Sequence, residues 1–232
     1  MKIEIWFDYA CPFCYIEKRQ LENTLESFAG RDDLEITYRA FELDPDADCK
    51  KVVSARNMFM SKYGYTSEQA DKAIEDITKF ASTVGLNFNY HKALYTNTFD
   101  AHRISKYAET KGKGIEIVEK LLHAFFIENR ELNNHNVLID IAIEIGLDKL
   151  QVEKVLKSNK FTEEVRYDEL KAKELGIRAV PYCIIDEKYS ISGAQSADMI
   201  KKVIGKALSV KSIENKNFMG MACGVNGCGN QN

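Results

Sequence analysis

The sequence predicts an α/β fold in which a long all-α segment is inserted between two parts of a small strand-and-helix unit. Strand-like runs occur near both ends of the chain, where apolar residues alternate with polar ones or lie between turn residues. Between these ends, apolar residues recur almost throughout at the spacing of amphipathic helices. That middle block is too long to be a loop, so we interpret it as a helical insertion.

The first part of the chain has the order β-α-β. Apolar side chains alternate along residues 2–7, which predicts a strand, and residues 34–41 show a second strand pattern. The helix between them begins after Pro12, and Gly30 ends it. A helix of that length can cross between two parallel strands.

The last part of the chain returns to strands after Gly176. Residues 177–186 form an apolar strand that contains a proline, residues 189–193 pair with it as a hairpin, and residues 194–207 close the fold as a helix. We therefore expect three units: a discontinuous α/β domain over residues 1–45 and 175–212, a helical subdomain over 46–174, and a flexible cysteine-containing tail over 213–232.

Composition narrows the class of protein. The chain has 232 residues, 45% of them hydrophobic and 29% charged, which suits a globular protein that needs no disulfides to hold its core. The formal charge of −3 gives no electrostatic reason to expect a nucleic acid or a membrane as partner. Glu4 and Asp8 interrupt the apolar start, and no long uncharged apolar run occurs, so we expect a cytoplasmic protein.

The chemistry-bearing residues are cysteines. Six occur, at Cys11, Cys14, Cys49, Cys183, Cys223 and Cys228. In a reducing compartment, closely spaced pairs of cysteines are more often redox-active or metal-binding than structural.

The pair in Cys11-Pro12-Phe13-Cys14 lies where the first strand gives way to the first helix. At that position the Cys11 sulfur meets unpaired backbone N–H groups and the positive end of the helix, which favour the reactive thiolate. Pro12 suits the first helical position, because its missing N–H is not needed there. Cys14 follows one turn later and is suited to resolve a mixed disulfide. A C-x-x-C in this context is typical of a thioredoxin-like redox motif.

Zinc binding is the alternative for the same cysteines. Cys11 and Cys14 would supply half of a site that Cys223 and Cys228 complete, since both spacings occur in zinc proteins. The strand-to-helix context favours redox chemistry, and we predict no metal site. Apart from zinc, Cys223 and Cys228 could relay electrons to the first pair or form a regulatory disulfide. We favour a second redox pair.

Four ordered segments give the chain a family resemblance. They are residues 7–16, 97–103, 176–181 and 192–195, and together they resemble the FrnE-like branch of the DsbA family over nearly the whole chain. The C-x4-C of Cys223 and Cys228 is similar to a second motif in some FrnE-like proteins. The resemblance implies a thioredoxin fold with a helical insertion and thiol–disulfide exchange.

The resemblance also implies roles for residues outside the cysteine pair. Pro181 is expected to be a cis proline that faces Cys11 and Cys14, although a trans proline at a strand start is the alternative that the residues alone leave open. A cis bond there would leave the Val180 backbone to pair with an extended substrate. Pro12 and Phe13 are expected to contact the substrate, and so is His102, for which a capping or packing role is equally compatible with the sequence. Cys49 and Cys183 are interpreted as structural thiols.

These observations predict an oxidoreductase that exchanges disulfides with protein or peptide thiols through Cys11 and Cys14. No cofactor is expected, although glutathione or a thioredoxin system is a candidate co-substrate or partner. Two alternatives stay open: a glutathione-dependent isomerase or transferase of the same superfamily, and a zinc-binding module. The isomerases generally lack the paired cysteines, so the presence of both favours redox chemistry.

Overall fold

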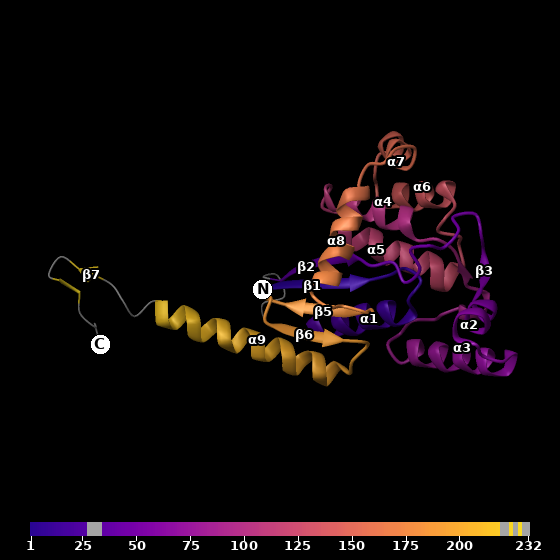
Figure 1. The fold of residues 1–232 in the computed structure, drawn as a ribbon. Helices are drawn as coiled ribbons and strands as arrows, with labels where there is room; N and C mark the ends of the chain where they lie inside the picture. The colour runs from indigo at the N-terminus through magenta and orange to yellow at the C-terminus, as the bar shows by residue number, and fades with distance from the viewer. Residues whose placement is uncertain (27–33, 219–222, 225–226, 229–232) are drawn as a thin grey trace.

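The fold is built around a four-stranded mixed sheet (Figure 1). The computed structural model describes residues 1–26, 34–218, 223–224 and 227–228, and their side chains as far as residue 208. The strands are β1 (Lys2–Phe7), β2 (Glu35–Ala40), β5 (Tyr182–Ile185) and β6 (Tyr189–Ser192), in the order β2-β1-β5-β6. β1 and β2 run parallel, whereas β5 is antiparallel to both β1 and β6.

The predicted β-α-β unit is confirmed. Helix α1 (Pro12–Glu26) connects the parallel strands β1 and β2. The predicted helix end at Gly30 lies outside the described residues. The alternating pattern of β1 places Ile3 and Ile5 in the main apolar core, while Trp6 belongs to a separate buried cluster with Ala172 and Ile177.

The predicted hairpin is also present, but its first strand is shorter than expected. β5 begins only at Tyr182, because residues 177–178 have no regular structure and residues 179–181 form a bend before it. The hairpin turn contains Asp186 and Glu187, both with positive φ, at 45° and 57°. Two left-handed residues in succession match the twist of the paired strands, which explains how so short a connection closes the hairpin.

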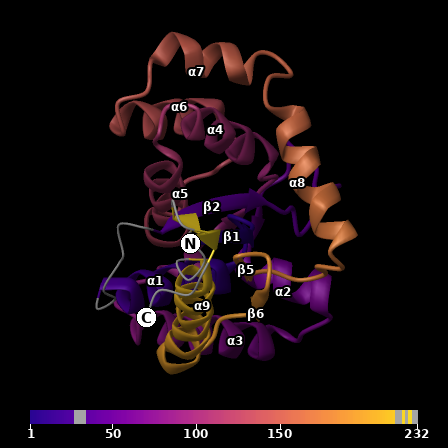
Figure 2. The same cartoon turned by 90° about the vertical axis from the view of Figure 1, so that its left-hand side faces the viewer.

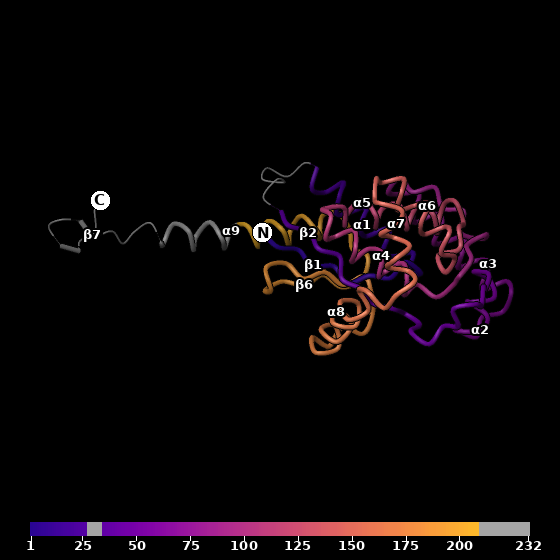
Figure 3. Tube along the Cα trace, turned by 90° about the horizontal axis from the view of Figure 1, so that it is seen from above, coloured from indigo at the N-terminus to yellow at the C-terminus, as the bar shows by residue number. Residues whose placement is uncertain are grey.

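Most of the chain between β2 and β5 is helical, as predicted. Its helices are α2 (Ala55–Tyr63), α3 (Ser67–Ser82), α4 (Phe99–Glu109), α5 (Gly114–His123), α6 (His135–Glu144), α7 (Lys149–Leu156) and α8 (Thr162–Glu174), with a 3-10 turn at Tyr90–Lys92 and a π-helical turn at Ala124–Glu128. Figure 2 shows α4, α6 and α7 above the sheet and α8 descending beside it. Figure 3 shows α2 and α3 together at the end of the molecule away from the N-terminus.

Two features of the insertion were not predicted. α2 has no expected counterpart, and two short strands, β3 (Val53–Ser54) and β4 (Leu94–Tyr95), pair antiparallel inside a block that was expected to be all α. Strands of two residues are too short to show any periodicity. α3 begins with a capping box, in which the Gln69 N–H donates to the Thr66 side chain at 3.3 Å and the Thr66 N–H donates to the Gln69 side chain at 2.9 Å.

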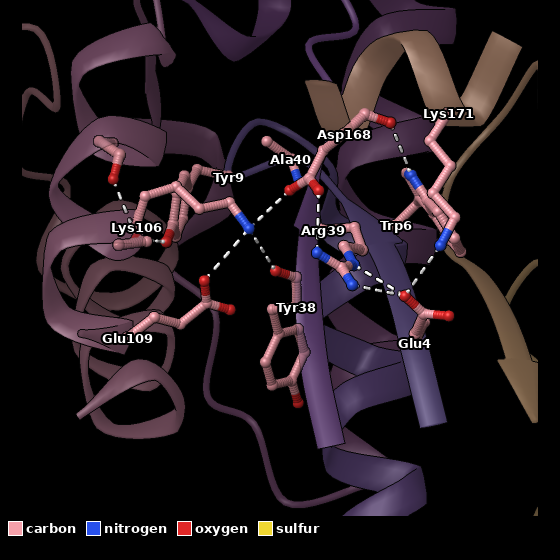
Figure 4. A network of polar contacts seen from close by, with 12 residues as sticks. Glu4, Trp6, Tyr9, Tyr38, Arg39, Ala40, Lys106, Glu109, Asp168 and Lys171 are labelled. Carbon is pink, nitrogen blue, oxygen red and sulfur yellow. Dashed lines mark hydrogen bonds and ion pairs between the residues drawn. The ribbon is translucent and has the colours of Figure 1, made fainter. Parts of the chain in front are cut away.

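A buried polar network joins the insertion to the sheet (Figure 4). The carboxylate of Asp168, on α8, accepts hydrogen bonds from the Ala40 N–H at 2.9 Å and the Arg39 guanidinium at 3.1 Å. It also lies 2.6 Å from the Lys106 ammonium of α4. Arg39 continues the network to Glu4 of β1, 2.6 Å away. Four elements, β1, β2, α4 and α8, are therefore held together by ion pairs and hydrogen bonds among largely buried side chains.

The end of the chain continues from the sheet as helix α9 (Ala197–Phe218). This helix contains the predicted closing helix and extends into the segment predicted as a tail. Beyond it, β7 (Cys223–Gly224) and β8 (Gly227–Cys228) pair antiparallel, with Cys223 opposite Cys228. The side chains of these two cysteines lie outside the described residues. Among the helices that the structure describes, none has the length and apolar composition needed to cross a bilayer.

Candidate active site

Cys11 lies in the turn between β1 and α1, as predicted. Its backbone N–H donates to the Asp8 carbonyl oxygen at 3.1 Å, which closes the turn directly after the strand. Pro12 begins the helix, where no backbone donor is required. The Cys14 N–H donates to the Cys11 carbonyl oxygen at 3.1 Å. The two cysteines therefore lie at the beginning and the end of the first helical turn.

Both cysteines of this pair are free thiols and are equally buried, each 4% exposed. Burial raises the pKa of Cys14 well above its ordinary value, and the neighbouring Cys11 and the charge of Asp8 act in the same direction, against a hydrogen bond with the Asp8 backbone. Cys14 therefore stays protonated until a reaction begins. Exposure does not distinguish the two sulfurs, but the cavity described below does, because Cys11 lines it and Cys14 is not among its lining residues.

The loop before β5 brings Val180 and Pro181 to the same place. The Cys11 thiol lies 3.5 Å from the Val180 carbonyl oxygen and donates to it. The peptide bond between Val180 and Pro181 is cis, which agrees with the conformation that the family resemblance implies. The Pro181 carbonyl accepts the Gly193 N–H at 2.9 Å, which ties this loop to the end of β6.

A cavity of about 700 Å³ opens beside Cys11, between the sheet domain and α2. The side of the sheet domain contributes Cys11, Pro12, Phe13 and Val180. Phe13 is 38% exposed, which is unusual for a phenylalanine and leaves an apolar ring at the cavity entrance. Three of the four residues expected to contact substrate therefore lie around the sulfur of Cys11.

The opposite wall of the cavity is aromatic and was not predicted. It is formed mainly by Phe59, Tyr63, Tyr65, Tyr90 and Tyr95. The rim carries acidic side chains at residues 44, 46 and 48 and basic ones at Lys51 and Arg178. The closely spaced Tyr63 and Tyr65 are the visible signal in the sequence, but only their position opposite Cys11 gives them meaning.

His102, the fourth residue expected to contact substrate, lies behind Asp8. Its side chain is 1% exposed and does not line the cavity. The ring packs against Phe7 and Tyr9, with centroids 5.3 and 4.9 Å away, and its Nε2 atom is 3.5 Å from the Asp8 carboxylate. That distance makes an electrostatic contact rather than a well-formed hydrogen bond. A direct contact between His102 and substrate stays a prediction.

Asp8 is a buried acid beside the cysteines. Its carboxylate accepts hydrogen bonds from the Thr98 hydroxyl at 2.8 Å and from the Leu43 N–H at 2.7 Å. Burial alone would raise the pKa of Asp8, but His102, Leu43 and Thr98 together hold it below its ordinary value. Asp8 is therefore ionised. Thr98 was not predicted as part of the site, because it lies far away in sequence and belongs to the insertion.

Cys49 and Cys183 are not among the residues that line the cavity. Cys183 is 3% exposed on β5, and Cys49 is exposed in the loop before β3. Among the residues that the structure describes, no group of three or more cysteine, histidine or acidic side chains is arranged to hold a metal ion. The zinc alternative is not tested by this, because it needs the side chains of Cys223 and Cys228.

A β-α-β unit with a cysteine pair at the start of its helix, opposite a cis proline before an antiparallel hairpin, defines a thioredoxin-like protein. The model of the DSBA-like thioredoxin domain family matches residues 2–205, and the chain belongs to that family. Membership shows the class, DsbA-like oxidoreductases with a thioredoxin-like fold, and leaves the branch open.

Individual proteins are similar to this chain over most of their length. A structure of a probable DsbA oxidoreductase from Streptomyces coelicolor is 31% identical, with a TM-score of 0.86 and full coverage of both chains. The uncharacterized protein YwbO of Bacillus subtilis is 27% identical over 205 residues, which cover 87% of this chain and 94% of YwbO. The cytosolic disulfide reductase DsbM of Pseudomonas aeruginosa with GSH shares the fold, at 11% identity, a TM-score of 0.60 and coverage of 93% and 100%.

Proposed function

We propose that this chain exchanges disulfides with protein or peptide thiols, with Cys11 as the nucleophile and Cys14 as the resolving cysteine. The observation that carries the proposal is the position of Cys11, which opens α1, lines the cavity and lies 3.5 Å from the Val180 carbonyl. Phe13 and Val180 beside it would hold a peptide segment, through an apolar contact and a main-chain contact respectively.

In the reductive direction, the Cys11 thiolate attacks one sulfur of a substrate disulfide. A mixed disulfide forms and the other substrate sulfur leaves as a thiolate. Cys14 then loses its proton and attacks the Cys11 sulfur, which releases the second substrate thiolate and leaves the Cys11–Cys14 disulfide. The substrate has gained two electrons, and a thiol reductant such as glutathione or a thioredoxin-type dithiol must return them to the enzyme.

The oxidative direction is the reverse of these steps. A reducing cytoplasm, which we propose as the location, favours reduction in steady state, and oxidative stress favours oxidation. We further propose that Cys223 and Cys228 act as a second redox pair that exchanges with the first. In this proposal the chain belongs to the FrnE-like branch, on its similarity in four ordered segments and in the C-x4-C of Cys223 and Cys228.

Reduction of insulin disulfides by the full chain tests the proposal. Cys11→Ser should abolish turnover, because no nucleophile remains at the cavity, and Cys14→Ser should stall at the mixed disulfide. Cys183→Ser is the matched control, because it removes a buried thiol outside the cavity. Full activity of Cys11→Ser would overturn the proposal.

The second candidate is a glutathione-dependent isomerase or transferase. The cavity beside Cys11, at about 700 Å³, is large enough for a small-molecule substrate, and this observation keeps the candidate open. An enzyme of this kind would keep its activity on a small aromatic substrate with glutathione after Cys14→Ser. The oxidoreductase proposal expects no turnover that survives the loss of Cys14.

A further inference from the structure

Asp8 is the strongest unexplained feature of the site. Its carboxylate is buried in the turn that leads into α1, with Asp8 itself only 1% exposed. Two hydrogen bonds, from Thr98 and Leu43, are short, and the Ala10 N–H adds a longer one at 3.3 Å. These donors favour the ionised carboxylate, because each of them stabilises a negative oxygen more strongly than a neutral one, and they help to hold the pKa of Asp8 below its ordinary value. The surroundings therefore maintain a negative charge that solvent does not screen.

That charge lies beside the cysteine pair. Asp8 and Cys11 line the same cavity, and the Cys11 N–H bonds to the Asp8 backbone, so the two residues share one turn. The positive end of α1 stabilises a thiolate at this position, whereas a carboxylate beside it has the opposite effect. The charge of Asp8 also acts to raise the pKa of Cys14, in addition to burial and Cys11 and against a hydrogen bond with the Asp8 backbone, and this agrees in direction.

We propose that the buried Asp8 carboxylate is a positioning residue for the redox equilibrium, which shifts the Cys11–Cys14 pair toward the disulfide and so makes the enzyme a better reductant. This inference rests on the proposed function. The disulfide form carries no charge on sulfur, whereas the reduced pair gives up a proton to become a thiolate. A fixed negative neighbour therefore destabilises only the reduced form, and the effect grows as pH rises and more thiolate forms.

The other charged groups near Asp8 do not account for the proposed effect on the Cys11–Cys14 equilibrium. His102, on α4, is the basic group that faces it, 3.5 Å away. Glu42, which follows β2, is a second buried acid, and burial raises its pKa to about 7, with Glu169 and Asp8 adding to the rise and Arg166 opposing it. Arg166 lies 2.6 Å from Glu42 and offsets its charge. The acidic side chains at residues 44, 46 and 48 on the cavity rim are exposed, so solvent screens them, and Asp8 is the buried acid that acts on the cysteine pair.

The test is a titration of the full chain in glutathione redox buffers, for the natural protein and Asp8→Asn. The tryptic peptide of residues 3–18 contains both Cys11 and Cys14, so mass spectrometry can quantify this pair separately from the other cysteines. Asparagine keeps the shape and the acceptor oxygen but removes the charge. We expect the equilibrium constant to shift about tenfold toward the dithiol, which corresponds to about 30 mV, and we expect a larger shift at alkaline than at acidic pH.

Asp100→Asn is the matched control. It removes the same charge from a carboxylate that pairs with Arg103 and His135 and does not line the cavity. The equilibrium constant of the Cys11–Cys14 pair should therefore stay unchanged. If Asp8→Asn does not fold, as judged by circular dichroism, Asp8→Ser removes the charge with a smaller side chain. Its equilibrium constant must then shift toward the dithiol as well.

An unchanged constant in the Asp8 variants, a shift toward the disulfide, or an equal shift in Asp100→Asn would overturn the inference. Its failure is distinguishable from failure of the proposed function. If Cys11 and Cys14 did not form a redox pair, the peptide would not titrate in any of these proteins, whereas failure of the inference alone leaves a pair that titrates identically in all of them.

Discussion

The sulfur of Cys11 lies 3.5 Å from the carbonyl oxygen of Val180, a residue 169 positions later in the chain. This contact joins the two parts of the discontinuous sheet domain at the point where the reactive turn ends and the hairpin begins. The helical insertion between them supplies the far wall of the cavity and the hydroxyl that binds Asp8. Each part of the chain therefore contributes to one site.

The buried network at Asp168 should be essential for stability. Asp168→Ala would leave the buried Lys106 and the partly buried Arg39 without their shared carboxylate. Removing one partner of a buried ion pair costs about 3–5 kcal/mol. The free energy of unfolding in urea measures the loss. Asp71→Ala is the control, because it breaks an exposed pair with Arg56 and should cost less than about 1 kcal/mol. Equal losses in the two variants would contradict the role of the network.

Glu17 should make stability depend on pH. Burial raises its pKa from 4.5 to about 7, against the opposing hydrogen bond from the Gln195 N–H. Between these two values the folded protein holds a proton that the unfolded chain releases, so stability falls as pH rises from 4.5 to about 7 and then stays constant.

The size of this pH effect is up to about 3 kcal/mol, from the free energy of one pKa unit. Glu17→Gln keeps an acceptor for Gln195 and cannot ionise, so its unfolding free energy should fall less over that interval. Glu75→Gln, at an exposed position on α3, should follow the natural protein. Parallel curves for the natural protein and Glu17→Gln would exclude the effect.

Cys49 and Cys183 should differ in reactivity. Burial raises the pKa of Cys183 to about 12, with the charge of Glu17 adding to it, and the side chain is 3% exposed. Cys49 is exposed. Iodoacetamide added to the folded protein at neutral pH should therefore modify Cys49 and spare Cys183 until denaturant is present, as read by mass spectrometry. Rapid modification of Cys183 in the folded state would show that β5 opens.

Phe13 should limit how oxidising the cysteine pair is. Its side chain carries no charge and lies partly exposed between the two cysteines in sequence. Phe13→His would add a positive charge near the start of α1 at a pH below about 6.5, which stabilises the thiolate and shifts the pair toward the dithiol. Titration against glutathione measures this, with the neutral Phe13→Gln as control. Equal constants for the two variants at acidic pH would argue against a charge effect.

The sequence predicted the parts of the fold that depend on local patterns. The alternation of Ile3, Ile5 and Phe7 identified β1, and the cysteine pair directly after it identified the start of α1. The prediction of a strand over residues 177–181 was wrong, because apolar composition does not distinguish a strand from an extended loop around a proline. The strands β3 and β4 were missed, since two residues cannot show a period.

The surroundings of Asp8 show why the site itself was only partly predicted. Its acidity and its closeness to Cys11 are visible in the sequence, but its partners Thr98 and His102 belong to the insertion, about 90 residues away. No local pattern connects these positions. The same holds for the aromatic wall of the cavity, because its tyrosines come from α2, the residues after it, the 3-10 turn and β4, and only tertiary packing brings them together.

The most direct test of the account is to identify the sulfur that bonds to substrate. Cys14→Ser protein, mixed with a peptide that contains a disulfide, should accumulate a mixed disulfide, and peptide mapping by mass spectrometry locates it. The account predicts that the substrate is attached through Cys11 and that Cys11→Ser traps none. Attachment through Cys49, Cys183 or a tail cysteine instead, or trapping that persists without Cys11, would contradict the assignment of Cys11 as the nucleophile.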